Sequence, residues 1–91
     1  MTLPQAIVRL SGAMTFPGPQ MILKCPGSTV GEVLDHCCQL RPELRPRIFR
    51  DDGMVWVGVF LNGRSIKQLQ GLDTPVCEDD ELRLTPPIAG G

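Results

Sequence analysis

The segment Gly27–Leu40, GSTVGEVLDHCCQL, decides the fold. Thr29 followed by Glu32 fits a capping box, with Ser28 as an alternative cap, and Pro42 requires the helix to end before it. Apolar residues then recur at helical spacing, at Val30, Val33, Leu34, Cys37 and Leu40. The segment predicts one main helix whose apolar stripe must be covered by another layer.

Strand-like alternation on both sides of this helix supplies that layer. The predicted strands are Gln5–Ser11, Gln20–Cys25, Val55–Leu61, a short one near residues 64–66, and Glu81–Thr85. Asn62-Gly63 is a favoured hairpin turn between two of them. One helix on one face of a small mixed sheet is an α+β arrangement. The expected inward residues are Val8, Leu10, Val57, Val59, Leu61, Leu82 and Leu84.

Composition narrows the class of protein. A chain of 91 residues is long enough for a single domain, 1–91, with one modest core. The net charge of -1 argues against nucleic acid as a partner. The start of the chain lacks the features of a secretory signal, and the apolar run 55–61 is far shorter than the ~20 residues of a membrane helix. We therefore expect a cytoplasmic protein that does not bind membranes.

Two further groups of residues have structural interpretations. The arginines between residues 41 and 50 and the acidic run Glu78–Glu81 are predicted to be solvated surface, with a role in docking as the alternative. The four cysteines and His36 do not have the spacing of a zinc site, so no metal is expected. At least one of Cys37 and Cys38 should be a small core residue.

The sheet face opposite the helix is predicted to bind a partner. Alternation places Ile7, Trp56, Phe60, Arg83 and Thr85 on it. Large apolar side chains rimmed by arginine are typical of interfaces. The alternative is that the loop at residues 12–19 covers Trp56 or Phe60.

The last residues form a distinct tail, which we expect to be flexible: Pro86, Pro87, Ile88, Ala89, Gly90 and Gly91. The prolines hold the approach extended, and two glycines without Cβ atoms can enter a narrow channel. A terminal carboxylate at Gly91 could then attack ATP at phosphorus. The alternatives are a disordered end, a truncation or a cloning scar.

The helix start 27–34, the segment Phe60-Leu61-Asn62-Gly63, and the residues from Asp79 to Gly91 together resemble the ubiquitin-like β-grasp sulfur carriers. These are typified by the molybdopterin-synthase small subunit and the thiamine-biosynthesis sulfur carrier. The resemblance implies that an E1-like activating enzyme uses ATP to adenylate Gly91. A sulfur donor then leaves a thiocarboxylate, which a sulfur-accepting client enzyme consumes. The chain itself would hold no cofactor and no catalytic residue.

The sequence does not decide which biosynthetic pathway would receive the sulfur. Leu84 and Thr85 stand where molybdopterin-synthase small subunits often carry aromatic residues, although the double proline and Ala89 favour that group. Segments 41–52 and 71–76 are similar to carriers that feed cysteine synthesis. Two other functions remain: a ubiquitin-like modifier joined through Gly91 to lysines, and a plain protein-interaction module.

Overall fold

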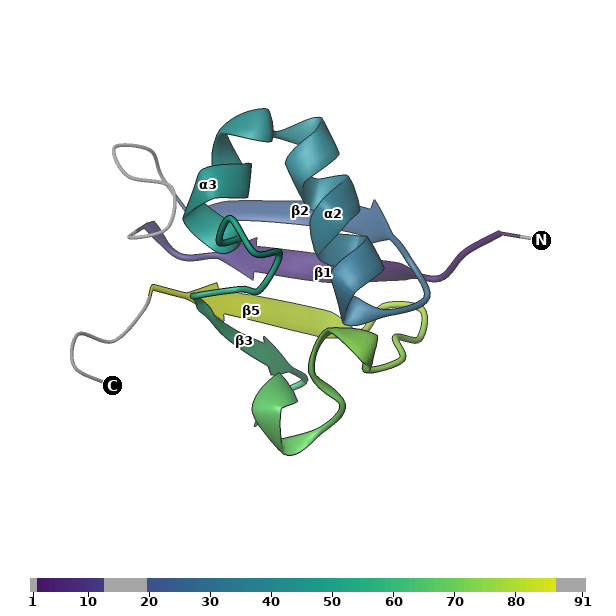
Figure 1. The fold of residues 1–91 in the computed structure, drawn as a ribbon. Coiled ribbons are helices and arrows are strands. Elements are labelled where there is room, and N and C mark those ends of the chain that lie inside the picture. The colour runs from purple at the N-terminus through teal and green to yellow at the C-terminus, as the bar shows by residue number, and fades with distance from the viewer. Residues whose placement is uncertain (1, 13–19, 87–91) are drawn as a thin grey trace.

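The computed structural model describes residues 2–12 and 20–86. Five strands form one mixed sheet in the order β2-β1-β5-β3-β4, in which β1 and β5 are parallel and the other neighbours are antiparallel. Helix α2 lies across one face of this sheet (Figure 1). The strands are β1 (Gln5–Leu10), β2 (Met21–Pro26), β3 (Gly58–Leu61), β4 (Arg64–Ser65) and β5 (Glu81–Thr85). The helical elements are α2 (Val30–Leu40), α3 (Arg45–Ile48) and the 3-10 turns η1 (Pro42–Leu44), η2 (Ile66–Gln68) and η3 (Gly71–Asp73).

Helix α2 begins as the sequence predicts. The Thr29 hydroxyl accepts a hydrogen bond from the Glu32 amide at 3.2 Å. The Glu32 carboxylate accepts from the amide and hydroxyl of Ser28, at 2.9 and 2.8 Å, so Ser28 takes the second half of the capping box. These bonds satisfy amides that a helix start leaves without partners.

The apolar stripe of α2 differs from the prediction at its end. Leu40 is 58% exposed, whereas Cys38 is buried. The reason is that η1 and α3 pack beside the helix, with Leu44 and Ile48 buried, and they cover the side on which Cys38 lies. The prediction of Leu40 as a core residue was wrong. The other stripe residues and all the predicted inward strand residues are buried.

Strand β3 is shorter than predicted. It begins at Gly58, because the residues before it bond to the α3 segment and not to the sheet. Val55 forms an isolated bridge with Phe49, and the Trp56 amide donates to the Ile48 carbonyl at 3.2 Å. Trp56 therefore lies outside the sheet. The prediction that Trp56 is a strand residue, placed by alternation on the face opposite the helix, was wrong.

The predicted Asn62-Gly63 turn is confirmed, with φ of 51° at Asn62 and 86° at Gly63. Such positive φ values are the signature of the two-residue hairpin turn, and glycine adopts them without strain. Asn62 also fixes the start of β5. Its amide donates to the Glu81 carbonyl at 2.8 Å, and its side-chain oxygen accepts from the Glu81 amide at 2.9 Å.

The acidic run before β5 is a structural turn and not only solvated surface. Asp80 accepts from the Asn62 side chain at 3.0 Å and from the Cys77 amide at 2.8 Å. Glu78 accepts from the Gln5 amide at 2.9 Å. These bonds hold β5 in register between β1 and β3. Within the described ranges, no helix is long and apolar enough to cross a membrane.

Candidate functional site on the open face of the sheet

The open face is the sheet surface opposite α2, and it carries four of the five predicted partner-binding residues. Phe60 on β3 and Arg83 on β5 are register partners, as are Gly58 and Thr85. Ile7 on β1 lies beside Glu81 of β5. The side chains of Ile7, Phe60 and Thr85 are partly buried, and Arg83 is exposed. The structure therefore brings Ile7, Phe60, Arg83 and Thr85 together on one surface.

Trp56 lies near Phe60 although it is not part of a strand. Its indole nitrogen donates to the Arg47 carbonyl at 3.1 Å, and 53% of the residue is exposed. Trp56, Phe60, Thr85 and Pro86 line one side of a groove of about 390 Å³ at the edge of the sheet, and residues of the helix side, among them Val59, Ile66 and Leu72, line the other. The prediction of Trp56 as a surface residue near Phe60 is thus compatible with the structure, although it is not a strand residue.

Gly58 shapes this groove and was missed in the sequence. A Cβ atom at this position would clash with the Thr85 hydroxyl and press on the Phe60 ring. Gly58 therefore allows Thr85 and Phe60 to pack closely across β3 and β5. A glycine within a strand indicates such a close approach, so the signal was present between Val57 and Val59.

The C-terminal tail adjoins this groove. Pro86 is the last residue that the structure describes, and it follows β5 directly. The predicted sulfur-carrying residue Gly91 and the tail residues Pro87, Ile88, Ala89 and Gly90 lie outside the described residues. The loop 12–19, predicted as an alternative cover for Trp56 or Phe60, also lies outside them except for Gly12.

The open face carries a charged cluster at its centre. Arg9 and Arg83 are register partners on β1 and β5. Both approach the same carboxylate, that of Glu81, at 3.0 Å from Arg9 and 3.8 Å from Arg83. The side chain of Arg83 is 65% exposed. The sequence reasoning named Arg83 as a site residue but did not recognise that Arg9 and Glu81 complete the cluster.

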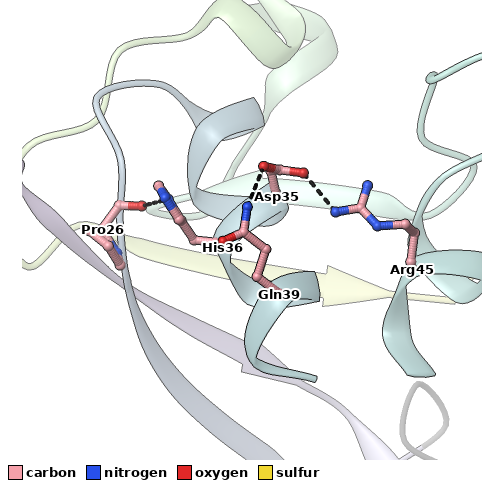
Figure 2. Close-up of polar contacts among 5 residues, drawn as sticks. All are labelled: Pro26, Asp35, His36, Gln39 and Arg45. Carbon is pink, nitrogen blue, oxygen red and sulfur yellow. Dashed lines mark hydrogen bonds and ion pairs between the residues drawn. The ribbon is translucent and has the colours of Figure 1, made fainter. Parts of the chain in front are cut away.

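The arginines on the helix side have acidic neighbours of their own. Figure 2 shows Asp35 of α2 between Gln39 and Arg45, with Arg45 at 2.7 Å and Gln39 at 3.1 Å. The Arg45 hydrogen bond lowers the pKa of Asp35 below its ordinary value. Arg41 pairs with Glu43 at 2.9 Å. These contacts fasten α3 and η1 to α2, so this part of the arginine group, predicted as solvated surface, is exposed and also has a structural role.

His36 and three of the four cysteines are engaged in structure. The His36 ring nitrogen Nδ1 lies 2.6 Å from the Pro26 carbonyl, so it carries the proton and donates (Figure 2). Cys37 is buried, and the neighbouring Cys25 thiol together with burial raises its pKa. Burial likewise raises the pKa of Cys38. Cys77 is exposed, but its amide rather than its thiol is engaged in the β5 turn.

The described residues contain no group of three or more His, Cys, Asp or Glu side chains that could hold a metal ion. The arrangement on the open face offers apolar contact, two guanidinium groups and a groove at the base of the tail. Such a surface can bind and orient a protein. It does not bring together a nucleophile and a base, which catalysis by the chain itself would need.

The fold and the open face define a ubiquitin-like β-grasp protein. The solution structure of small archaeal modifier protein 1 from Methanosarcina acetivorans matches it with a TM-score of 0.77 and 25% identity, covering 100% of both chains. The ThiS family model matches residues 12–91, so the chain belongs to the ThiS family. This confirms the resemblance inferred from the sequence and places the protein among sulfur carriers and ubiquitin-like modifiers.

Two curated relatives represent these two roles. A protein of Archaeoglobus fulgidus described as a sulfur carrier is 31% identical over 65 residues, which is 69% of this chain and 74% of that protein. Small archaeal modifier protein 1 of Haloferax volcanii is 36% identical over 66 residues, covering 70% of this chain and 71% of the relative. Both are named as carrier or modifier proteins and not as catalysts.

Proposed function

We propose that the chain is a cytoplasmic sulfur carrier whose C-terminal carboxyl group, at Gly91, is activated by an E1-like enzyme. The carboxylate attacks the α-phosphorus of ATP, pyrophosphate leaves, and an acyl adenylate forms. Sulfide supplied by a sulfur donor then attacks the acyl carbon, AMP leaves, and a thiocarboxylate remains at Gly91. The observation that carries this proposal is the ThiS family match, which extends through Gly90 and Gly91.

The geometry supports a function in which the chain supplies the reacting group and a partner protein supplies the catalytic groups. Strand β5 has neighbours on both sides and ends at Thr85, directly before Pro86. A partner bound on the open face receives the tail at a defined place. Since an acyl adenylate hydrolyses in open water, the partner must enclose it during the reaction. The chain supplies the carboxyl group and the docking surface, and the partner supplies the catalytic groups.

The client enzyme accepts the sulfur. We propose that it acts in molybdopterin-type cofactor synthesis or in cysteine synthesis. In both cases the thiocarboxylate sulfur is the nucleophile, and the chain returns with an ordinary carboxylate. The genes next to that of the carrier would distinguish these pathways, because a client enzyme and an activating enzyme are useful only together with the carrier.

A second function is favoured by the modifier relatives. The same activated Gly91 could be attacked by a lysine amine of another protein, with release of AMP and formation of an isopeptide bond. The two functions share the activation step and differ only in the nucleophile. The similarity to small archaeal modifier proteins of two organisms supports this alternative.

Intact-mass analysis of the protein purified from its native host tests these functions. A sulfur carrier should show the replacement of one oxygen by sulfur at the C-terminus, and treatment with an alkylating agent should label that sulfur. Adducts on lysines that resist thiols would identify a modifier. Normal growth after deletion of Gly90 and Gly91, with no altered mass, would leave a plain interaction module and contradict both proposals.

A further inference from the structure

Strand β2 forms one edge of the sheet, since β1 is its only neighbour in the strand order. The Gly27 amide donates to the Pro4 carbonyl at 2.9 Å, and opposed residues of an antiparallel pair alternate between bonded and non-bonded pairs. Counting back from this contact in steps of two, Leu23 bonds to β1, whereas Ile22 and Lys24 direct their amide and carbonyl groups away from it. Among the residues that the structure describes, these outward groups have no hydrogen-bond partner.

Two features close this edge at its C-terminal end. Pro26 has no amide hydrogen to offer to a further strand. Its carbonyl accepts a hydrogen bond from the His36 ring of α2 at 2.6 Å (Figure 2). The unpaired stretch is therefore 20–24, QMILK, which we call the free edge.

Apolar side chains surround the free edge on both sides of the sheet. Ile22 is 60% exposed, and its neighbours Met21 and Leu23 are only partly buried against the core. Leu40 of α2 is 58% exposed and follows His36 by four residues, so it lies on the side of the helix that faces β2. An apolar edge with unpaired backbone groups is a template for pairing with another chain.

We propose that the free edge binds a second copy of this chain, with the two β2 strands antiparallel about a twofold axis at Ile22. In this register Ile22 opposes Ile22 of the second copy, Met21 opposes Leu23, and Gln20 opposes Lys24. Each of the three opposed pairs with outward backbone groups then exchanges two hydrogen bonds. A contact that uses the same residues on both chains is typical of twofold dimers.

Two other registers of the free edge are less favourable. A twofold axis at Lys24 would place two lysines opposite each other and would set Ile22 against Pro26, which cannot donate. An axis at Leu23 would set Pro26 against Gln20, so each end of the ladder would lose a bond, and Ile22 would oppose a lysine. The axis at Ile22 avoids the proline and pairs apolar residues with apolar residues.

Charge also favours a second copy over a charged partner. Lys24 is the one charged residue of the stretch 20–24, and its ammonium group lies 3.7 Å from Glu78 and 3.4 Å from Asp79 of its own chain. The complement of such an edge is an apolar strand of low charge, and β2 is itself one. The inference does not rest on the proposed function, because β1 separates the free edge from β5 and the tail.

The test uses the full chain and two lysine variants. Ile22→Lys places like charges on the twofold axis, whereas Met54→Lys adds the same charge at an apolar residue of similar exposure, 57% against 60%. Sedimentation equilibrium over a wide range of concentrations measures the dissociation constant of the dimer. Amide hydrogen exchange of single residues, followed by NMR at low and high concentration, reports which backbone groups become paired.

We expect the unaltered chain to pass from 10.0 kDa to twice that mass as its concentration rises. Ile22→Lys should raise the dissociation constant about tenfold or more, and Met54→Lys should leave it unchanged. An equimolar mixture of Ile22→Lys and Ile22→Glu should dimerise again, because opposite charges then face each other. The amides of Ile22 and Lys24 should exchange rapidly in the monomer and slowly in the dimer, while the Leu23 amide is protected in both.

Three results would overturn the inference. One is a mass of 10.0 kDa at every concentration. Another is a dimer that both lysine variants weaken equally, or in which the Ile22 and Lys24 amides stay unprotected, because the second copy would then bind elsewhere. The third is slow exchange of these two amides in the monomer, which would mean that the chain covers its own edge. Since the exchange measurement uses the unaltered chain, it decides the question even if a variant fails to fold.

Discussion

Leu34 and Leu40 on α2 provide a direct test of the packing described here. Both are leucines on the same helix, but Leu34 has no exposed surface and Leu40 is 58% exposed. Leu34→Ala removes three buried carbon atoms, worth about 0.8 kcal/mol each, or about 2.4 kcal/mol. The remaining cavity raises the total to as much as about 5 kcal/mol. A domain of this length has a free energy of unfolding of roughly 5–14 kcal/mol.

Leu40→Ala is the matched control. The loss of its partial burial is offset by the higher helix propensity of alanine, so the change should stay within about 0.5 kcal/mol. Thermal and urea unfolding followed by circular dichroism would measure both variants. At about 4 °C per kcal/mol, Leu34→Ala should lower Tm by at least about 8 °C. Equal effects of the two substitutions would refute the orientation of α2 on the sheet.

Three other predictions concern the open face, the tail and the thiols. Phe60→Ala should weaken binding to the activating enzyme by about 2 kcal/mol in calorimetry and should cost the fold less than Val59→Ala, its inward neighbour; binding loss that follows stability alone would place the docking site elsewhere. Deletion of Gly90 and Gly91 should leave Tm nearly unchanged and abolish ATP–pyrophosphate exchange, and retained exchange would contradict activation at Gly91. Among the cysteines of the folded protein, alkylation at neutral pH should label Cys77 alone, as peptide mass mapping can show, because the other three are buried. The labelled carrier should still form the thiocarboxylate, and a loss of transfer would indicate a relay through Cys77.

The sequence predicted the features that depend on local spacing. Alternation in β1 and β5 identified the inward residues Val8, Leu10, Leu82 and Leu84 because successive side chains of a strand point to opposite faces. The start of α2 was predictable because a capping residue acts on an amide three positions away. The hairpin turn was predictable because Asn-Gly tolerates positive φ at both positions.

Features that depend on distant contacts were not predictable. The segment 55–57 has the composition of a strand, yet Ile48 and Phe49 provide backbone partners for it and delay the start of β3. The burial of Cys38 depends on the packing of η1 and α3, which no pattern within α2 reveals. The charged cluster at Glu81 required the register of β1 against β5, because Arg9 is far from Glu81 in the sequence.

The position of β5 in the sheet limits where the proposed chemistry at Gly91 can occur. β5 has ladder partners on both sides, and its start is fixed by Asn62 and by the bond from the Ile7 amide to the Asp80 carbonyl at 2.8 Å. Pro86 therefore leaves the sheet at a defined point beside the open face. Five residues follow it in the sequence, and at most about 3.5 Å per residue gives a reach of about 17 Å from Pro86. Under the proposed function, a partner held on the open face has to place its ATP within that distance, so that docking on the sheet and reaction at the tail belong to the same complex.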